Sequence, residues 1–334
     1  MVGWGIIGIG NHAGTRMAPA FQRTPNSRLL AVCSRDRDRA LAFASKHGAE
    51  AGYDSFDQLL EHRGVEVVYV ATPHNLHKEY VVRAAQAGKH VMCEKPMALR
   101  VSQAEEMIAA CRSAGVTLGV CFQNRQHPAH VEARRLVASG EVGDVRLVRS
   151  QYSRSGRPEL KGWRADPAMG GAGGLMGLGL HAIDVVRYVT GQEIAEVSAM
   201  MDSDPSTGVL DNEVAMLMRL TGGGFVLVNN SRRLPWANND LIVNGSRARV
   251  SALGTVGTYL QGNLQITREG STSQTDYADP DAGTGLYASM IEDFSRSVEE
   301  RRAPMATGDD GLAMVRMVDA ILQSVKERRA VRLQ

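Results

Sequence analysis

The chain has few of the features that mark secreted, membrane-spanning or zinc-binding proteins. Only four of its 334 residues are cysteine, and they show no Cys-x-x-Cys pair and no zinc spacing. Each cysteine lies in or beside an apolar segment, which predicts buried, reduced thiols and a cytoplasmic protein. No apolar run approaches the ~18 residues of a membrane span. The first ten residues lack the basic start and the cleavage site of a signal peptide, so we expect a strand there.

Charge of one sign is also lacking. The chain has 38 basic and 36 acidic residues and a net charge of +2, and nothing in this balance suggests the basic domain or stripe that a nucleic-acid surface needs. No cluster of metal-ligating residues stands out, and we predict no metal site. Apolar residues make up 43% of the chain, enough for a large core. A length of 334 residues suits two domains better than one.

The first 121 residues alternate between strands and helices. Apolar strand-like runs occur at 3–9, 29–33, 65–71, 90–93 and 116–121, and helical patterns separate them. The run at 65–71 is rich in β-branched residues, as in a parallel strand buried on both faces. This order predicts a doubly wound parallel α/β sheet, a Rossmann domain, over residues 1–121.

The pattern changes after residue 121. Strand-like runs at 145–152, 197–202, 214–220, 224–230, 240–243, 248–252 and 264–267 follow one another without the alternating helices. Glycine, asparagine and serine turns separate most of them. We therefore predict a second domain over residues 122–334, an α+β domain with a large, mostly antiparallel open sheet. Two amphipathic helices, 287–300 and 308–328, end the chain.

A dinucleotide-binding turn follows the first strand. It reads Gly8-x-Gly10-x-x-Ala13, in which the first glycine permits the tight turn and the second lets the backbone approach a pyrophosphate. The helix that follows presents its N-terminus to the phosphates. A glycine turn without a ligand is the alternative, but the strand–turn–helix context favours a cofactor. The residues of this turn expected at the cofactor are Gly8, Ile9, Gly10, Asn11 and His12.

The end of the second strand distinguishes NADP from NAD. NAD-binding proteins place a carboxylate there, whereas this chain has Ser34-Arg35, with Arg39 one helical turn later. A guanidinium pairs with a 2′-phosphate that a carboxylate would repel. We predict NADP as the cofactor, bound through Ser34, Arg35 and Arg39. NAD is the alternative, with Arg35 as a solvated surface charge and Asp36 on the ribose.

Two further strand ends lie at the same predicted sheet edge. The strand at 65–71 leads into Thr72-Pro73-His74-Asn75-Leu76-His77, and the strand at 90–93 leads into Glu94-Lys95-Pro96. Loops at the carboxyl ends of parallel strands line the ligand crevice. Lys95 is therefore the first candidate for an acid/base, because partial burial lowers the pKa of a lysine towards a useful range. A phosphate-contacting or surface lysine is the alternative. Further expected cofactor contacts are Thr72, Pro73, Asn75 and His77.

Together these motifs resemble one enzyme family. The Gly-x-Gly turn, Ala-Thr-Pro-x-Asn-x-His at 71–77, Ala-Gly-Lys-His-Val at 87–91 and Glu-Lys-Pro at 94–96 resemble the glucose–fructose oxidoreductase/inositol dehydrogenase/rhizopine catabolism (Gfo/Idh/MocA) family. Gly-Trp-Arg at 162–164 and a glycine-rich run leading to His181-x-x-Asp184 extend the likeness over essentially the whole chain. Among its members, the NADPH-dependent 1,5-anhydro-D-fructose reductases look most similar.

The resemblance implies roles for particular residues. It implies Lys95 as the acid/base, Glu94, Trp163, Arg164 and Tyr287 beside the cofactor, and His181 as a second catalytic or substrate-binding group. Asp184, three residues after His181, shares its helix face and is a substrate-binding candidate. A packed core histidine is the alternative for His181. The implied activity is hydride transfer between a nicotinamide and a carbonyl or alcohol of a sugar, keto-sugar or cyclitol.

One position departs from the family pattern. Polyol-oxidising members carry an aspartate four residues before the histidine, and this chain has Gly177 there. Glycine in a helix interior costs ~1 kcal/mol relative to alanine. Gly173, Gly174, Gly177 and Gly179 together suggest a face kept open for a close-approaching ligand or backbone.

Two other functions remain open at this point. A dinucleotide-binding sensor without turnover would not need both Lys95 and His181. A sugar lyase or hydrolase that uses transient oxidation by tightly held NAD would not need Arg35. The open sheet needs a cover on its second face, so we expect a homodimer or homotetramer. The only other expected partner is a small-molecule sugar or cyclitol substrate, with neither nucleic acid nor membrane.

Overall fold

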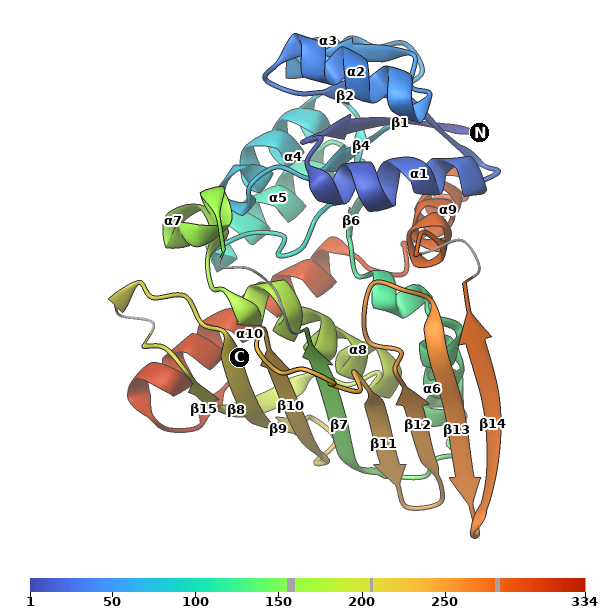
Figure 1. Ribbon diagram of the computed structural model, residues 1–334, viewed down its shortest axis with the longest axis vertical. Coiled ribbons are helices and arrows are strands. Elements are labelled where there is room, and N and C mark those ends of the chain that lie inside the picture. Colours follow the sequence, from blue (N-terminus) through green and yellow to red (C-terminus); the bar gives the residue numbers. More distant parts are fainter. Residues whose placement is uncertain (155–159, 205–206, 280–282, 334) are drawn as a thin grey trace. The chain divides into compact units, whose positions relative to one another are not determined.

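The computed structural model describes residues 1–154, 160–204, 207–279 and 283–333, which form two compact units (Figure 1). Unit 1 consists of Met1–Cys121 and Gly283–Val315. Unit 2 consists of Phe122–Ala282 and Arg316–Gln334. The sequence places a boundary after residue 121, where the units also divide. It assigns 283–315 to the second domain, whereas these residues pack with unit 1.

Helix α9 (Gly285–Glu299) explains why this late segment belongs to unit 1. Its apolar face buries Tyr287 and Phe294 in the core cluster that contains Trp4. The Trp4 indole N–H donates a hydrogen bond to Ser295 Oγ at 2.9 Å, and its ring meets Phe294 edge to face at 5.5 Å. An amphipathic pattern predicts that a helix packs somewhere, but these contacts determine which core receives it.

The sheet of unit 1 is parallel throughout. It contains six strands, β1 (Val2–Ile7), β2 (Ser27–Cys33), β3 (Ala51–Tyr53), β4 (Val67–Val70), β5 (His90–Cys93) and β6 (Leu118–Val120). Their spatial order is β3-β2-β1-β4-β5-β6, which confirms the doubly wound prediction. The sequence reading missed β3, whose three residues, Ala-Gly-Tyr, carry no β-branched side chain.

Apart from α9, the helices of unit 1 lie between these strands in the sequence. They are η1 (Ala13–Met17), α1 (Ala18–Ala20), η2 (Phe21–Arg23), α2 (Arg37–His47), α3 (Phe56–Glu61), η3 (His74–Leu76), α4 (His77–Gln86), α5 (Val101–Ser113) and α9. Helix α10 (Gly308–Glu327) begins in unit 1 and ends in unit 2. All four cysteines of the chain are buried free thiols.

The sheet of unit 2 is mostly antiparallel, as predicted. Its strands are β7 (Val145–Ser153), β8 (Ile194–Met201), β9 (Glu213–Leu220), β10 (Phe225–Ser231), β11 (Leu241–Gly245), β12 (Arg249–Leu253), β13 (Gln261–Arg268), β14 (Ser271–Ala278) and β15 (Val331–Arg332). The spatial order is β14-β13-β12-β11-β7-β10-β9-β8-β15, with β7 and β10 paired in parallel. The sequence pattern predicts neither β14, whose first six residues are all polar, nor β15, which has only two residues.

Helices cover one face of this sheet. The helices of unit 2 include η4 (Gln123–Gln126), α6 (Pro128–Ala138), η5 (Gly162–Ala165), α7 (Pro167–Gly170), η6 (Leu175–Gly179) and α8 (Leu180–Thr190), and α6, η6 and α8 contact its strands. Figure 1 shows α6 and α8 against the sheet, and every residue of α8 is buried. Along β9 the residues alternate, with Met216 and Met218 buried and Leu217 exposed on the face away from the helices.

The helical run Pro167–Thr190 corrects one expectation. From the sequence we expect no apolar run of membrane-spanning length. This run has 24 residues and contains a window with a mean hydropathy of 1.3, so by length and composition alone it could cross a membrane. Alanine and glycine, which are easily passed over when apolar residues are counted, make up much of this run. The window is 72% buried inside the structure, as in the core helix of a folded domain.

Candidate active site

The glycine turn of unit 1 combines one crowded position with one open position. Gly8 has φ +95°, and a Cβ there would lie 2.5 Å from the carbonyl carbon of Ala71 at the end of β4. A Cβ at Gly10, by contrast, would meet no described atom within 4 Å. Ala13 is 1% exposed and packs in the core. The turn therefore leaves its backbone open to a ligand at Gly10, where the motif expects a pyrophosphate.

The arginine-rich end of β2 lies beside this turn. Asp36 is the N-cap of α2, and its carboxylate accepts a hydrogen bond from the backbone N–H of Arg39 at 3.0 Å. The Arg39 guanidinium reaches back to the carbonyl oxygen of Ile9 at 2.9 Å. Ser34 Oγ accepts a weaker bond from the Asp36 N–H at 3.4 Å. Arg35 is exposed, and Asp36 is engaged as a cap.

Buried polar atoms without a partner follow β4. Thr72 Oγ1 and Asn75 Oδ1 are both inaccessible to solvent and have no hydrogen-bond partner among the described residues. Such atoms are rare in folded proteins because each costs ~1–3 kcal/mol. They lie in the loop whose backbone contacts Gly8. An open glycine and two unpartnered polar atoms at one sheet edge fit a bound dinucleotide.

His77 has a different place from the one the sequence suggested. Its ring is 0% exposed, with Nδ1 3.0 Å from the carbonyl oxygen of Pro96 and Nε2 3.0 Å from that of Thr72. Burial lowers the pKa of His77, although both carbonyl groups act in the opposite direction. The side chain therefore joins the β4 and β5 loops, and its backbone is the part left to contact a cofactor.

Glu94 is the centre of a polar cluster at the end of β5. The Tyr69 hydroxyl donates a hydrogen bond to Glu94 Oε1 at 2.6 Å, and His12 Nε2 lies 3.2 Å from the same oxygen. The backbone N–H of Lys95 donates to Oε2 at 3.2 Å. The Tyr287 ring meets the His12 ring edge to face, with centroids 5.4 Å apart. The cluster thus joins the glycine turn, β4, β5 and α9.

The charges around Glu94 keep it ionised. Burial by itself raises the pKa of a carboxyl group, but His12, the Tyr69 hydroxyl and Lys95 hold the pKa of Glu94 well below its usual range. Burial and the Glu94 charge together raise the pKa of Tyr69 well above normal, so this phenol stays a donor. Lys95 is half-buried, directly follows Glu94, and is joined to Pro96 by a cis peptide bond. A fixed negative charge therefore lies next to the candidate acid/base.

Tyr287 and the Trp163–Arg164 pair have contrasting surroundings. Tyr287 is 1% exposed, so little of its side chain is left for a cofactor to contact. The Arg164 guanidinium stacks over the Trp163 ring at 4.2 Å from its centroid, on the short helix η5 of unit 2. Each of these residues remains a predicted cofactor contact.

His181, in unit 2, is 5% exposed and held on two sides. Its Nδ1 lies 3.4 Å from Gln123 Nε2, and the same Gln123 nitrogen donates to the carbonyl oxygen of Gly257 at 3.0 Å. The Tyr152 ring meets the imidazole edge to face at 5.5 Å. The sequence reading assigned no role to Gln123 or Tyr152. The available signal is that the polar Gln-Asn-Arg run comes directly after the apolar segment of β6.

Asp184 is bound within unit 2. Arg125 donates through Nε to Oδ2 at 3.0 Å and through Nη2 to Oδ1 at 2.6 Å, and the two side chains are 5% and 1% exposed. Arg125 also lies over the rings of Phe122 and Tyr188, at 5.5 Å from each centroid. This bidentate pair fixes α8, which carries His181, to η4, which carries Gln123. Because Asp184 is buried in this pair, it fits a role in positioning α8 better than direct contact with substrate.

The glycines before His181 fall into two groups. A Cβ at Gly173 would lie 2.3 Å from the carbonyl oxygen of Asp211, one at Gly174 2.8 Å from that of Asn212, and one at Gly179 2.6 Å from the Asn230 side chain. Neighbouring groups of unit 2 thus require these three glycines. A Cβ at Gly177 would meet no described atom within 4 Å. Gly177 alone in this group leaves space that no described part of the chain needs.

Asp211 anchors the start of the same segment. Its carboxylate accepts hydrogen bonds from the backbone N–H groups of Gly173 and Leu175, both at 2.6 Å. Burial raises the pKa of Asp211, and the two N–H groups oppose that rise. The sequence reading missed this residue, because an aspartate in a turn between strands carries no local signal of a helix 36 residues away.

A hollow of about 200 Å³ lies beside the His181 cluster within unit 2. Tyr152, which contacts His181, and Gly257, which holds Gln123, both line it. Thr258 Oγ1, also in its wall, is buried without a partner among the described residues. Its other polar side chains are those of Arg154, Asn239, Tyr259 and Gln261. A lining of this kind suits a ligand that carries several hydroxyl groups.

Comparisons with known proteins agree with this architecture. The family described as "Oxidoreductase family, NAD-binding Rossmann fold" matches residues 2–122, and the "GFO/IDH/MocA C-terminal domain" matches residues 130–251. A 1,5-anhydro-D-fructose reductase of Ensifer adhaerens is 27% identical over 99% of this chain and 98% of its own. A D-xylose 1-dehydrogenase (NADP(+)) of Haloferax volcanii is 29% identical over 99% of both chains.

Among solved structures, an aldose-aldose oxidoreductase from Caulobacter crescentus complexed with glycerol superposes with a TM-score of 0.89. It is 30% identical, and the match covers 99% of each chain. The family matches, the full-length relatives and the fold thus agree with the motifs at the glycine turn and at Glu94-Lys95-Pro96. The chain is a member of the Gfo/Idh/MocA family of NAD(P)-binding oxidoreductases.

Proposed function

We propose that this protein is an NADP-dependent oxidoreductase that interconverts a carbonyl and an alcohol on a sugar, keto-sugar or cyclitol. The observation that carries the proposal is the polar edge of the unit 1 sheet. There the open Gly10 turn, the Thr72 and Asn75 atoms that lack a partner among the described residues, and the Glu94–Lys95 pair follow neighbouring strands. The relatives named for sugar substrates support the substrate class.

The preference for NADP rests on the arginines at the end of β2. Arg39 already reaches the glycine turn through Ile9, and the exposed Arg35 follows the strand end directly. The carboxylate of Asp36 caps α2, so the residue that the NAD alternative would use is engaged elsewhere. Two guanidinium groups suit a 2′-phosphate. The Haloferax volcanii relative is named for NADP(+), which supports this choice.

The residues of the site have complementary roles in the proposed reaction. When bound, the nicotinamide supplies or accepts the hydride. Lys95 donates a proton to the oxygen of a carbonyl substrate, or accepts one from an alcohol. Glu94, kept ionised by His12 and Tyr69, stabilises the lysine ammonium before transfer. His181 contacts the substrate oxygen, and Asp184 positions it through the pair with Arg125.

The part of the substrate away from the reacting carbon would bind in the hollow beside His181. Its polar lining and the unpartnered Thr258 hydroxyl favour a polyhydroxylated ligand. A substrate hydroxyl group that enters this hollow can pair with the Thr258 hydroxyl, which has no partner among the described residues, and a deoxy analogue would lose that bond.

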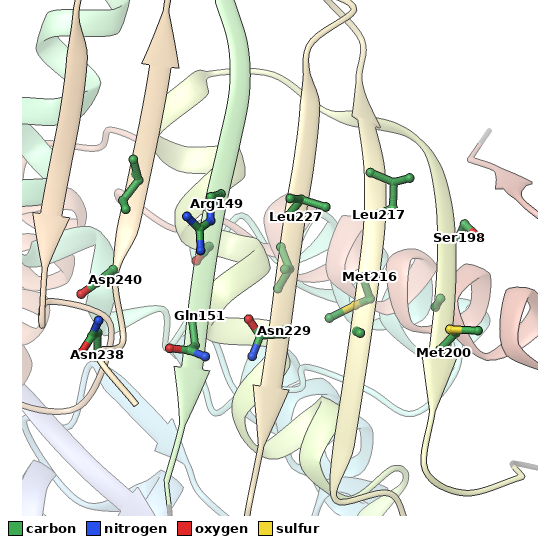
Figure 2. Close-up of a pocket in the computed structure, with 15 residues that line it drawn as sticks. Arg149, Gln151, Ser198, Met200, Met216, Leu217, Leu227, Asn229, Asn238 and Asp240 are labelled. Atoms are coloured by element: carbon green, nitrogen blue, oxygen red, sulfur yellow. The ribbon is translucent and has the colours of Figure 1, made fainter. Parts of the chain in front are cut away.

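The open face of the unit 2 sheet supports a homodimer or homotetramer. Figure 2 shows this face, with Leu217, Leu227 and Met200 on neighbouring strands. Met200 is 80% exposed, Leu217 48% and Leu227 43%. Polar groups such as Arg149 and Asp240 share the same shallow hollow of about 470 Å³. A mixed apolar and polar face of this kind suits a second copy of the sheet. The four buried free thiols support a reducing cytoplasm as the place of action.

A substrate and cofactor screen tests the proposal. Purified protein is assayed with sugars, keto-sugars and cyclitols against NADPH and NADH, and Lys95→Met serves as the loss variant. Lys78→Met is the matched control, because Lys78 forms a surface pair with Glu106. We expect turnover with NADPH that Lys95→Met lowers at least a thousandfold and Lys78→Met leaves unchanged. Cofactor binding without turnover of any substrate would instead favour the dinucleotide-binding sensor.

The NADP preference has its own test. Arg35→Ala and Arg39→Ala should each weaken NADPH binding by at least tenfold and leave NADH binding within about twofold, as expected for a lost charge-assisted contact. Arg37→Ala is the control, because its guanidinium contacts Asp54. Tightly retained NAD and unaltered binding in both variants would favour the lyase or hydrolase alternative.

A further inference from the structure

Gln123 occupies an unusual place for an amide side chain. It is 2% exposed, and its Nε2 faces two different acceptor positions, the Gly257 carbonyl oxygen at 3.0 Å and His181 Nδ1 at 3.4 Å. A carbonyl oxygen only accepts hydrogen bonds, so the nitrogen end of the amide must point to Gly257. The assignment of nitrogen and oxygen in this amide therefore follows from its chemistry.

The second N–H of the same nitrogen determines the state of His181. An amide nitrogen carries two hydrogens and no acceptor lone pair. One hydrogen is used by Gly257, and the other is directed to His181 Nδ1. A neutral imidazole has one protonated and one unprotonated nitrogen, so Nδ1 must be the unprotonated acceptor and Nε2 carries the hydrogen.

The surroundings keep this arrangement in place. Gly257 is held in turn by its own N–H, which donates to Asn124 Oδ1 at 3.0 Å. The Tyr152 ring packs edge to face on the imidazole and limits its rotation. The Arg125–Asp184 pair joins the short helix of Gln123 to the helix of His181. The amide and the imidazole are thus fixed relative to each other by contacts within unit 2.

We infer that Gln123 is a positioning residue that holds His181 in its Nε2–H form, so that His181 acts as a hydrogen-bond donor to the substrate oxygen and not as the general base. The inference rests on the proposed function, in which His181 contacts substrate. In carbonyl reduction, the substrate carbon gains a hydride from the reduced nicotinamide and its oxygen gains a proton from the Lys95 ammonium. The C=O double bond becomes a C–O single bond with new C–H and O–H bonds, and the nicotinamide is oxidised. His181 keeps its proton throughout and stabilises the negative charge that develops on the oxygen.

A substitution that reverses the polarity at Nδ1 tests this role. In Gln123→Glu the carboxylate accepts a hydrogen bond, so it favours a proton on His181 Nδ1. The neutral ring then presents an unprotonated Nε2 to substrate, and only the imidazolium still donates there. We therefore expect the variant to reduce substrate normally at low pH and to lose about tenfold in kcat per pH unit above the titration of His181. The wild-type enzyme should lack this His181-dependent limb and lose kcat only where the Lys95 ammonium deprotonates.

Two further variants separate charge and shape from tautomer control. Gln123→Met keeps the approximate shape without donor or charge, and Gln126→Glu places the same charge three residues later in the same short helix. Neither should create the alkaline limb. A purely structural role of Gln123 predicts equal losses at every pH in both Gln123 variants, and that result would overturn the inference.

A measurement without turnover keeps this inference distinct from the proposed activity. Nitrogen NMR of 15N-histidine-labelled protein, with His181 assigned through His181→Gln, reports which ring nitrogen carries the proton. We expect Nε2–H in the wild-type protein and protonated Nδ1 in Gln123→Glu. A wild-type spectrum with Nδ1–H would refute the inference even if the enzyme reduces sugars. An Nε2–H spectrum in a protein without turnover would refute the proposed function instead.

Discussion

Gly177 and Gly173 lie four residues apart in one glycine-rich segment, yet alanine should have opposite effects at the two positions. At Gly177 the new methyl group meets no described atom within 4 Å, so the substitution only removes the helix-interior cost of glycine. That change should stabilise the protein by ~0.5–1 kcal/mol. At Gly173 the methyl would lie 2.3 Å from the carbonyl oxygen of Asp211. The backbone must then move away from its anchor.

The loss at Gly173 follows from the contacts of Asp211. Its carboxylate accepts hydrogen bonds from Gly173 and Leu175 at 2.6 Å, and these charge-assisted bonds weaken when the segment shifts. A loss of ~2–4 kcal/mol is expected, since hydrogen bonds to charged groups contribute ~1.5–3 kcal/mol each. Thermal unfolding followed by circular dichroism measures both variants. With ~2–4 °C per kcal/mol, Gly177→Ala should raise Tm slightly and Gly173→Ala should lower it by ~4–16 °C. Equal shifts in the two variants would refute the reasoning.

The open space at Gly177 also bears on substrate choice. Gly177→Asp introduces the carboxylate that the family resemblance implies at this position, and Gly177→Leu fills the space with an apolar group. We expect Gly177→Leu to fold normally and to raise KM for bulky sugars at least tenfold, while Gly177→Asp changes the relative rates among sugars. Unchanged kinetics in both variants would show that this position does not tune the chemistry.

Three further predictions concern stability and assembly. Burial and the neighbouring His127 lower the pKa of His130 to about 3, so below pH ~6.5 the unfolded chain binds a proton that the folded unit does not. The free energy of unfolding should therefore fall by up to ~1.4 kcal/mol per pH unit until the folded pKa is reached. In urea unfolding at pH 4.5–7, His130→Gln should flatten this slope. Arg125→Met should lower the free energy of unfolding by ~3–5 kcal/mol, because the Asp184 carboxylate stays buried without its bidentate partner. A double variant that adds Asp184→Leu should recover most of that loss. An equal loss in the single and the double variant would contradict the pairing. Leu227→Glu should dissociate the proposed oligomer in analytical ultracentrifugation, while a charge at the exposed Leu41 of unit 1 should not; a wild-type monomer at micromolar concentration would exclude the assembly.

Much of the fold could be read from local patterns. The β-branched run that became β4 and the Gly8–Gly10 turn have distinctive sequences because a strand buried on both faces and a close backbone approach each restrict the residue types allowed. Strand β14 shows no periodicity in the sequence because its first six residues are all polar and exposed. The sequence also does not predict that α9 packs in unit 1, since an amphipathic pattern does not indicate which core the helix contacts.

The candidate site shows the same division. The sequence by itself determined the family, the cofactor turn and the lysine after β5, because motifs that contact a common cofactor are contiguous and chemically restricted. Only the tertiary structure decided that Glu94 lies between Tyr69 and His12, that Gln123 faces His181, and that Gly177 differs from its neighbouring glycines. These relations join residues up to 82 positions apart, and no local pattern carries them. A hydrogen bond depends on two atoms meeting at about 3 Å, which only the folded chain arranges.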